Sequence, residues 1–404
     1  MLGWWQSATP TAKRALVAAS LGWMLDSFDV MLYALVLTAL MRDLGMDAPT
    51  AGLLGSVTLV ASAAGGMLFG VIADRFGRTR ALMGSIVVYS IFTAMCGFAQ
   101  TVTQLAVFRV LLGLGMGGEW ASGAALVSET WPAEHRGKAL GLMQSAWAIG
   151  YGAAAIATAL ILPQWGWRAV FFVGVLPALL TIWVRRRVEE PAIWREQKPQ
   201  DKVSFSTVFA PAIRRVTIAV TLMNACTMFA WWGFNLWLPG YLSLSPSKGG
   251  IGLSTSVMSG FVVAMQVGMW FGYATFGFIG DVLGRKRAYV VYLLAAAVLI
   301  LLYVSIRTPL VLLLLGPFVA FFATGYFSGF GAVTAELYPT AIRATAQGFT
   351  YNIGRLASAV APFAVGTFAE TRGFSASLSM CSVAFLLAAI FWIWIPETRG
   401  RKLA

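Results

Sequence analysis

The apolar background of this sequence is interrupted by a short charged segment, Gly70-Val71-Ile72-Ala73-Asp74-Arg75-Phe76-Gly77-Arg78-Thr79-Arg80. The chain carries a second copy of it, Gly277-Phe278-Ile279-Gly280-Asp281-Val282-Leu283-Gly284-Arg285-Lys286-Arg287. Gly, Asp, Gly, Arg and Arg recur in register, and Asp74 and Asp281 are 207 residues apart (281 − 74). Because this separation is about half of the 404-residue chain, it indicates an internal duplication.

The composition predicts a membrane protein. Hydrophobic residues make up 59% of the chain and charged residues only 11%, which is too little charge to cover a soluble surface. Apolar runs of about 18–25 residues recur from end to end, and each is long enough to cross ~30 Å of hydrocarbon. The runs are continuous and lack the alternating pattern of ~10 residues that a β-barrel strand has. We therefore predict an all-α, multi-pass membrane protein.

The basic residues fall in alternate loops. A net charge of +13 suggests nucleic acid as a partner, so the location of the charges must decide. One set of loops holds most of the Lys and Arg, and the other holds only Arg42, Arg168, Lys248, Arg307 and Arg372. This alternation is the positive-inside bias of a membrane protein, and no nucleic-acid partner is expected. It places both termini and both charged segments on the cytoplasmic side of the inner membrane.

Twelve membrane spans in two sets of six are predicted, approximately at 14–40, 50–73, 81–100, 103–128, 138–162, 166–186, 213–242, 253–280, 288–306, 309–336, 344–368 and 374–395. They define a six-helix N-terminal bundle (1–187), a cytoplasmic linker (188–211) and a six-helix C-terminal bundle (212–404). Further residues recur at the same offset: Glu129, Pro132, Arg136 and Gly141 map onto Glu336, Pro339, Arg343 and Gly348. Two parallel six-helix repeats with a site between them near the bilayer midplane are the arrangement of a transporter.

The charged segment and its copy are typical of the major facilitator superfamily, which the sequence resembles over essentially its whole length. Three local patterns narrow the branch: Leu25-Asp26-Ser27-Phe28-Asp29, Arg109-x3-Gly113-x-Gly115-x-Gly117-Gly118-Glu119 and Ser128-Glu129-Thr130-Trp131-Pro132…Arg136-Gly137-Lys138. Together they look like the metabolite:proton symporters, the branch that contains sialate and aromatic-acid transporters. The resemblance implies a twelve-helix fold, a proton gradient in place of a cofactor, and a monomer in the lipid bilayer.

Three carboxylates inside the predicted spans are candidates for carrying the proton. A charge at the bilayer centre costs ~2.5–3.5 kcal/mol, so each should face a cavity or a partner. Asp26 and Asp29 are three residues apart and share a helix face, where their repulsion favours holding a proton. The alternative is that one of them only neutralises Arg109 in a structural ion pair. Glu119 is either a second proton site or a partner of Arg109 or of another helix.

Two arginines inside the predicted spans are candidates for holding an anionic substrate. A guanidinium binds a carboxylate through two parallel hydrogen bonds, so Arg109 in the fourth span and Arg355 in the eleventh suit an organic acid. The alternative for Arg109 is a helix-packing and coupling element near the Asp pair. The pocket is expected to be completed by amide and aromatic side chains, namely Tyr351, Asn352, Asn235, Trp231 and Gln144.

The charged segments are expected to act as latches of a cytoplasmic gate. In the resembled family the first aspartate meets the start of the eleventh helix, where partial positive charge favours a carboxylate, and this implies that role for Asp74. By the duplication, Asp281 would meet the start of the fifth span. We also expect ion pairs between Arg78 and Glu129 and between Arg285 and Glu336. Two further residues are assigned to the gate: Arg136 and Arg343.

These patterns predict a secondary transporter that imports a small organic acid anion together with protons by alternating access. The alternatives are a porter of neutral sugars or polyols, an exporter of organic cations, and a transporter-like nutrient sensor. No pattern indicates an enzyme, because the sequence has no nucleophile–base pair, phosphate loop or set of metal ligands. Gly113, Gly115 and Gly118 fit G-x-G-x-x-G, but no strand precedes them, so close helix packing is the better interpretation.

Overall fold

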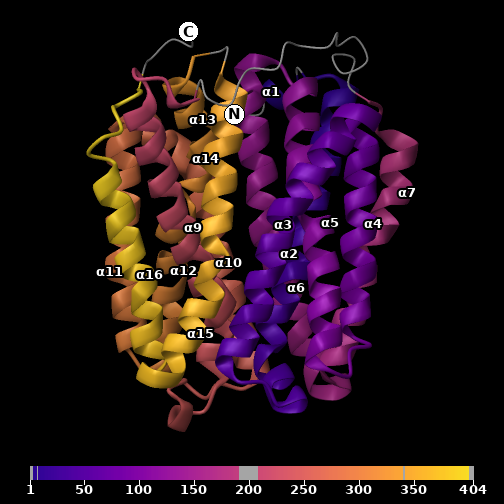
Figure 1. The fold of residues 1–404 in the computed structure, drawn as a ribbon, viewed down its shortest axis with the longest axis vertical. Helices are drawn as coiled ribbons and strands as arrows, with labels where there is room; N and C mark the ends of the chain where they lie inside the picture. Colours follow the sequence, from indigo (N-terminus) through magenta and orange to yellow (C-terminus); the bar gives the residue numbers. More distant parts are fainter. Residues whose placement is uncertain (1–2, 7, 191–207, 340–341, 400–404) are drawn as a thin grey trace. The chain divides into compact units, whose positions relative to one another are not determined.

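The structure is a computed structural model, and it describes residues 3–6, 8–190, 208–339 and 342–399. All regular elements among these residues are helices (Figure 1). The α-helices are α1 (Gly3–Gln6), α2 (Pro10–Leu44), α3 (Ala48–Phe76), α4 (Arg78–Cys96), α5 (Val102–Thr130), α6 (Ala133–Phe172), α7 (Pro177–Arg187), α9 (Arg214–Ser243), α10 (Thr255–Leu283), α11 (Arg285–Ser305), α12 (Pro309–Thr324), α13 (Phe327–Leu337), α14 (Arg343–Ser358), α15 (Val360–Arg372) and α16 (Phe374–Phe391). Two short 3-10 helices are η1 (Val173–Val175) and η3 (Pro246–Lys248).

The chain forms two compact units. The first comprises Met1–Asp47, Val57–Pro199 and Ser254–Val263, and the second comprises Ala48–Ser56, Gln200–Leu253 and Ala264–Ala404. Most of the predicted linker, 191–207, lies outside the described residues. The predicted domain boundaries at 187 and 212 therefore stay predictions.

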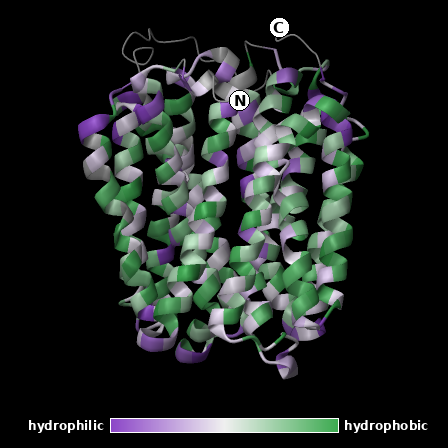
Figure 2. Ribbon diagram, turned by 180° about the vertical axis from the view of Figure 1, so that it is seen from behind, coloured by the Kyte–Doolittle hydropathy of each residue, from purple (hydrophilic) through white to green (hydrophobic). Residues whose placement is uncertain are grey.

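Ten stretches of the described residues are long and apolar enough to cross a membrane. Hydrophilic residues gather near the helix ends, and hydrophobic ones cover the lengths between them (Figure 2). The stretch Gly137–Leu180 is 44 residues long and covers the predicted fifth span and most of the predicted sixth (166–186), with a kink at Gly166. The predicted eleventh span is divided into α14 and α15, and each of these helices alone is too short to count among the ten stretches. Pro362 lies in the first turn of α15, and because it has no backbone N–H it cannot make the hydrogen bond that would continue α14.

Close helix packing in the first unit depends on glycine. Helix α5 lies so near α3 that a Cβ atom on Gly113 or Gly117 would overlap the carbonyl oxygens of Thr58 or Ser62. This confirms that the glycine-rich run of the fourth predicted span serves helix contact. Among small residues, only glycine lets two backbones approach to this distance.

The second unit repeats one of these contacts. A Cβ atom on Gly272 of α10 would overlap the carbonyl oxygen of Phe321 on α12. In the first unit Gly65 of α3 stands in the same relation to Leu114 of α5. Both residues of the second pair lie 207 positions after those of the first, so the duplication extends to backbone packing.

Each charged segment contains a helix start with a docked carboxylate. Helices α4 and α11 begin directly after Gly77 and Gly284, whose φ angles are 114° and 93°. Glycine is favoured at such angles, and a Cβ atom at either position would also collide with the carboxylate of Glu190 or Glu397. Glu190 accepts a hydrogen bond from the backbone N–H of Thr79 at 3.1 Å. The second glycine of the motif thus makes room for a carboxylate at the positive end of a helix.

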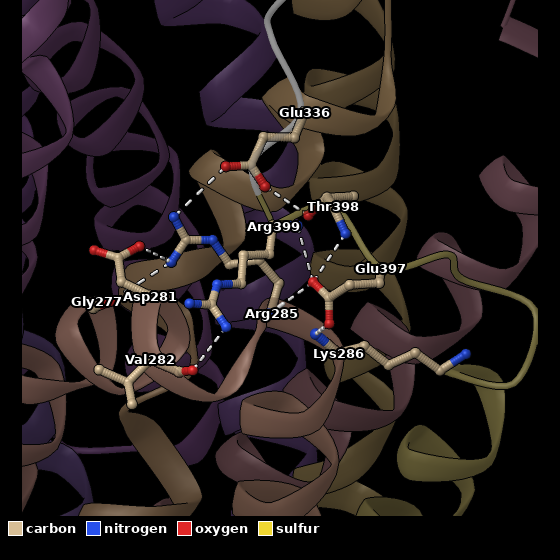
Figure 3. A network of polar contacts seen from close by, with 9 residues as sticks. All are labelled: Gly277, Asp281, Val282, Arg285, Lys286, Glu336, Glu397, Thr398 and Arg399. Carbon is tan, nitrogen blue, oxygen red and sulfur yellow. Dashed lines mark hydrogen bonds and ion pairs between the residues drawn. The ribbon is translucent and has the colours of Figure 1, made fainter.

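The second copy of this cap is the more extensive (Figure 3). Glu397 accepts hydrogen bonds from four backbone N–H groups, those of Arg285 (2.9 Å), Lys286 (3.1 Å), Thr398 (2.9 Å) and Arg399 (2.9 Å). Partial burial by itself raises the pKa of Glu397, but these four donors outweigh it and hold the pKa below its ordinary value.

In each unit, an arginine connects loops of the set that carries few Lys and Arg. In the first unit Arg168 forms an ion pair with Asp43 at 2.8 Å. In the second unit Arg307 donates to the carbonyl oxygen of Gly250 at 3.1 Å and to the hydroxyl of Ser375 at 3.0 Å. Gly250 and Ser375 lie 207 residues after Asp43 and Arg168, so corresponding loops are joined in the two units. In the second unit the guanidinium comes from Arg307, which lies in a third loop, between α11 and α12. Arg168 and Arg307, two of the five basic residues in the loops with few Lys and Arg, therefore have a structural role.

Glu397→Ala is expected to destabilise the second unit at neutral pH. The loss should be about 0.5–1 kcal/mol, the lower part of the range for a capping side chain because Glu397 is exposed to water. The folded pKa lies below that of the unfolded chain, ~4.3. The stabilisation is therefore fully present above that value and is lost as the pH falls through the folded pKa.

Thermal unfolding in detergent, followed by tryptophan fluorescence from pH 8 to pH 3, measures this difference. Glu370→Ala is the matched control, because Glu370 is an exposed carboxylate on α15 that accepts no hydrogen bond from another described residue. A Glu397→Ala difference from wild type that stays constant down to pH 3 contradicts the assignment.

Candidate functional site

The first unit buries four ionisable side chains from two helices. Asp26 and Asp29 on α2 and Arg109 and Glu119 on α5 each expose 1% of their surface or less. All four were predicted as functional residues. Such burial of charge inside apolar helices is costly, and the neighbours of each group therefore decide what it can do.

The four side chains gather along one face of α2. Gly22, Asp26, Asp29 and Tyr33 are separated by four, three and four residues, which places them on one face over ~16 Å of helix. At one end, a Cβ atom on Gly22 would overlap Oε1 of Glu119, so the carboxylate rests on the α2 backbone. At the other end, the guanidinium carbon of Arg109 lies 3.6 Å from the centre of the Tyr33 ring, a cation–π contact. We use the name α2 column for these residues together with three residues of α4. Its members are Gly22, Asp26, Asp29, Tyr33, Arg109, Glu119, Tyr89, Thr93 and Cys96.

Helix α4 contributes the rest of the α2 column. The Tyr89 hydroxyl donates to the carbonyl oxygen of Gly22 at 3.5 Å. Thr93, one turn further, lies beside the carboxyl group of Asp29 and donates to the carbonyl oxygen of Tyr89 at 2.8 Å. Cys96, three residues after Thr93, is fully buried at the end of α4. Tyr89, Thr93 and Cys96 were not predicted as site residues, although their spacing of four and three along one span indicates a polar helix face.

Helix α6 closes another side of α2. Ser27 donates to the carbonyl oxygen of Trp147 at 2.8 Å, and the rings of Trp23 and Trp147 lie 4.6 Å apart. Gln144, predicted to line the pocket, is half-buried on the preceding turn of α6. Its substrate role stays a prediction.

In the second unit, amide and aromatic side chains of α9 make contacts between and within helices. Asn224 donates to the carbonyl oxygen of Thr350 at 3.1 Å and thereby joins α9 to α14. Asn235 donates to the carbonyl oxygen of Trp231, one turn earlier, at 3.0 Å. Trp231 in turn packs edge-on against Phe327, with 6.2 Å between ring centres. Trp231 and Asn235 are both buried in the second unit, on one helix face.

Arg355 is the buried cation of the second unit. It exposes 5% of its surface near the end of α14, and no carboxylate among the described residues lies within ion-pair distance of it. Tyr351, one turn earlier, lies 6.0 Å from Phe330 between ring centres. Asn352 donates to the carbonyl oxygen of Gly348 at 2.9 Å. Within the described part of the chain, the Arg355 charge is therefore not neutralised by a protein carboxylate.

The ion pairs expected beside the charged segments are present. Arg78 pairs with Glu129 at 3.0 Å in the first unit, and Arg285 approaches Glu336 at 3.6 Å in the second. Arg285 also forms an ion pair with Asp281, four residues earlier in the chain, at 2.7 Å (Figure 3). The contact predicted between Asp281 and the start of the fifth span stays a prediction.

Three predicted gate residues cannot be assigned contacts. The side chains of Asp74, Arg136 and Arg343 lie outside the described residues. The latch proposed for Asp74 therefore stays a prediction.

Comparison with known proteins agrees with this arrangement. The family described as Major Facilitator Superfamily matches residues 19–274 and 220–404. A probable 4-methylmuconolactone transporter of Cupriavidus pinatubonensis is 33% identical over 408 residues, covering 99% of this chain and 94% of that protein. The sialic acid transporter NanX of Escherichia coli is 32% identical over 388 residues, covering 95% and 93%.

A crystal structure of a D-xylose-proton symporter has a TM-score of 0.77 at 20% sequence identity, covering 97% of this chain and 100% of that one, which shows the shared fold. The family and these relatives are transporters and not enzymes. The ten apolar stretches and the bacterial relatives make this a multi-pass protein of the inner membrane. The chain belongs to the Major Facilitator Superfamily, in agreement with the branch of organic-acid transporters that the sequence resembles.

Proposed function

We propose that this chain is a proton-coupled symporter that imports a small organic acid anion by alternating access. The observation that carries the proposal is the α2 column, in which one unit buries three carboxylates beside a buried arginine. Structural ion pairing alone needs fewer acids, and every buried charge costs free energy. The relatives named for sialic acid and 4-methylmuconolactone support an organic solute.

Asp26, Asp29 and Glu119 are proposed to carry the proton. Asp26 and Asp29 are three residues apart and buried on one face of α2, where two negative charges repel each other with little screening. Binding one proton removes that repulsion, so occupancy by a proton is coupled to the state of the first unit.

Arg355 is proposed to bind the substrate carboxylate. Its charge is buried without a described carboxylate partner, which supports a role in receiving an anion. Tyr351, Asn352, Asn235, Trp231 and Gln144 are proposed to shape the pocket. Arg109 is proposed to bind an anion or to couple the Asp pair to it. Its cation–π contact with Tyr33, one turn from Asp29, supports the coupling role.

Twelve spans, cytoplasmic termini and a monomeric state are part of the proposal. The 44 residues of Gly137–Leu180 suffice for two crossings, each of which needs about 20 residues, and α14 with α15 supplies one more. The buried arginines do not favour an exporter of organic cations, and a porter of neutral sugars or polyols would not need them. No observation favours a nutrient sensor.

Uptake into proteoliposomes tests the substrate class and the coupling together. A panel of benzoate, gentisate, nicotinate and sialic acid, with and without an inward proton gradient, should give accumulation of at least one acid only with the gradient. Arg355→Met should weaken that uptake by at least tenfold, because a bidentate charged contact contributes about 1.5–3 kcal/mol.

Arg372→Met is the control variant, since Arg372 lies at the exposed end of α15. Uptake that is independent of the gradient, or no acid in the panel that competes, overturns the proposed function. Normal acid affinity in Arg355→Met moves the binding site elsewhere and leaves the coupling intact.

Asp26→Asn or Asp29→Asn is expected to abolish accumulation driven by the proton gradient while counterflow is partly retained. The amide cannot exchange a proton, but substrate exchange across the membrane does not require net proton movement. Paired assays of gradient-driven uptake and counterflow separate the two effects. If both variants accumulate substrate as wild type does, these residues do not carry the proton.

Asp74→Asn is expected to shift the population toward the inward-facing state and to slow transport with little change in substrate affinity. The reason is that a latch on the cytoplasmic side stabilises only the state in which that side is closed. Accessibility of single cysteines placed in the cytoplasmic halves of the spans reports the population, and competition binding reports the affinity. A large loss of affinity with an unchanged population is the opposite result.

A further inference from the structure

Tyr89 occupies a central position in the α2 column that the proposed roles of the other residues do not explain. It is fully buried on α4, one helix turn before Thr93. Its hydroxyl reaches across to the carbonyl oxygen of Gly22 on α2. At the same Gly22 the Glu119 carboxylate of α5 rests on the backbone. Side chains from α4 and α5 therefore meet at a single residue of α2.

The Tyr89 hydroxyl is weakly held where it stands. Its hydrogen bond to the Gly22 carbonyl is 3.5 Å long, well beyond the usual 2.7–2.8 Å of an O–H···O bond. An ionised carboxylate is a stronger acceptor than a carbonyl oxygen and draws a neighbouring hydroxyl into a shorter bond. A hydroxyl that is fixed only loosely can turn from one acceptor to another at little cost.

The acids around Tyr89 come from two helices. Glu119 of α5 meets Gly22, the residue that the Tyr89 hydroxyl reaches. Asp26 lies one turn after Gly22 on the same face of α2, and Asp29 lies beside Thr93, one turn after Tyr89. Among the described residues, α6 and α7, which also pack near α4, add no titratable group to this set. Arg109, Tyr33 and Cys96 form the neighbouring group toward the other end of the column. Tyr89 thus lies among all three carboxylates proposed to carry the proton.

We propose that Tyr89 is a positioning residue for the transported proton: its hydroxyl, seated at Gly22, donates to whichever neighbouring carboxylate is ionised and thereby joins Glu119, Asp26 and Asp29 into one proton-binding cluster. This inference rests on the proposed proton coupling. The phenol keeps its own proton throughout and only changes acceptor. When all neighbouring carboxyls are protonated, the hydroxyl returns to the Gly22 carbonyl.

A purely structural role for Tyr89 makes a different prediction. The backbone of Tyr89 packs tightly on α5, since a Cβ atom on Gly115 would lie 2.6 Å from its N atom. That contact belongs to the backbone and survives removal of the hydroxyl. A structural role therefore predicts that Tyr89→Phe leaves the pH dependence of transport unchanged, whereas a positioning role predicts a shift.

The test is the pH profile of uptake by Tyr89→Phe in proteoliposomes, using the acid of the panel that gives the largest uptake. A hydroxyl that donates to an ionised carboxylate favours its charged form, so removing it makes the cluster hold its proton more tightly. We expect the midpoint of gradient-driven uptake to move to higher pH by about half to one unit, and the counterflow KM to stay within twofold.

Tyr241→Phe is the matched control. Tyr241 is a buried tyrosine of the second unit whose hydroxyl also donates to a backbone carbonyl, that of Val304, at 3.3 Å. It should leave the midpoint unchanged. Glu119→Gln and the double variant Tyr89→Phe/Glu119→Gln complete a cycle in which the two shifts should fall short of additive, because both residues act on one cluster.

The outcomes separate this inference from the function on which it rests. A wild-type profile without proton dependence overturns the proposed function. A proton-dependent wild type whose midpoint is unmoved in Tyr89→Phe, or shifts that are fully additive with Glu119→Gln, overturns the role of Tyr89 alone. If Tyr89→Phe yields too little folded protein, Gly22→Ala provides the second test, since the added Cβ displaces the Glu119 carboxylate and should also move the midpoint.

Discussion

A charge inside a membrane protein must be held by its neighbours, because the hydrocarbon offers no water to solvate it. The first unit meets this constraint with the α2 column. Glu119 rests on the backbone at Gly22, where any larger residue would displace it, and Arg109 covers the face of Tyr33. Both contacts join α5 to one face of α2. The three acids lie on neighbouring turns of this column, where they share polar neighbours.

The two halves keep one scaffold but differ in chemistry. Gly272 packs on Phe321 in the second unit as Gly65 packs on Leu114 in the first, so the backbone contact survived duplication. The acids did not, because the position that follows Asp26 by 207 residues is Gly233, a residue without a titratable group. The second unit instead buries amides, aromatic rings and Arg355. The proposed roles follow this difference, with proton binding assigned to the first unit and anion binding to the second.

The charged segments join local backbone geometry to the gate that is proposed for them. Their second glycine has a positive φ angle, so that a distant carboxylate, Glu190 or Glu397, caps the helix that follows. Their arginines then reach Glu129 and Glu336 at the ends of other helices in the same unit. Each segment therefore ties three parts of its unit together. Such ties hold the parts of one unit together, as the proposed alternating access would require of each half.

The sequence by itself determined the membrane class, the helical fold and the duplication, and it named the charged candidates for the site. The length of the apolar runs, the fixed 207-residue offset and the cost of a buried charge can all be read along the chain. It also predicted the pairs Arg78–Glu129 and Arg285–Glu336, since duplication made them recognisable twice. Only the tertiary structure brought Tyr89 to Gly22 and placed Glu119 against the same residue, because contacts across three helices depend on helix rotation, which no single span encodes. It likewise decided that Asn224 joins α9 to α14, since an amide on a helix face meets either a substrate or a neighbouring backbone, and packing makes the choice.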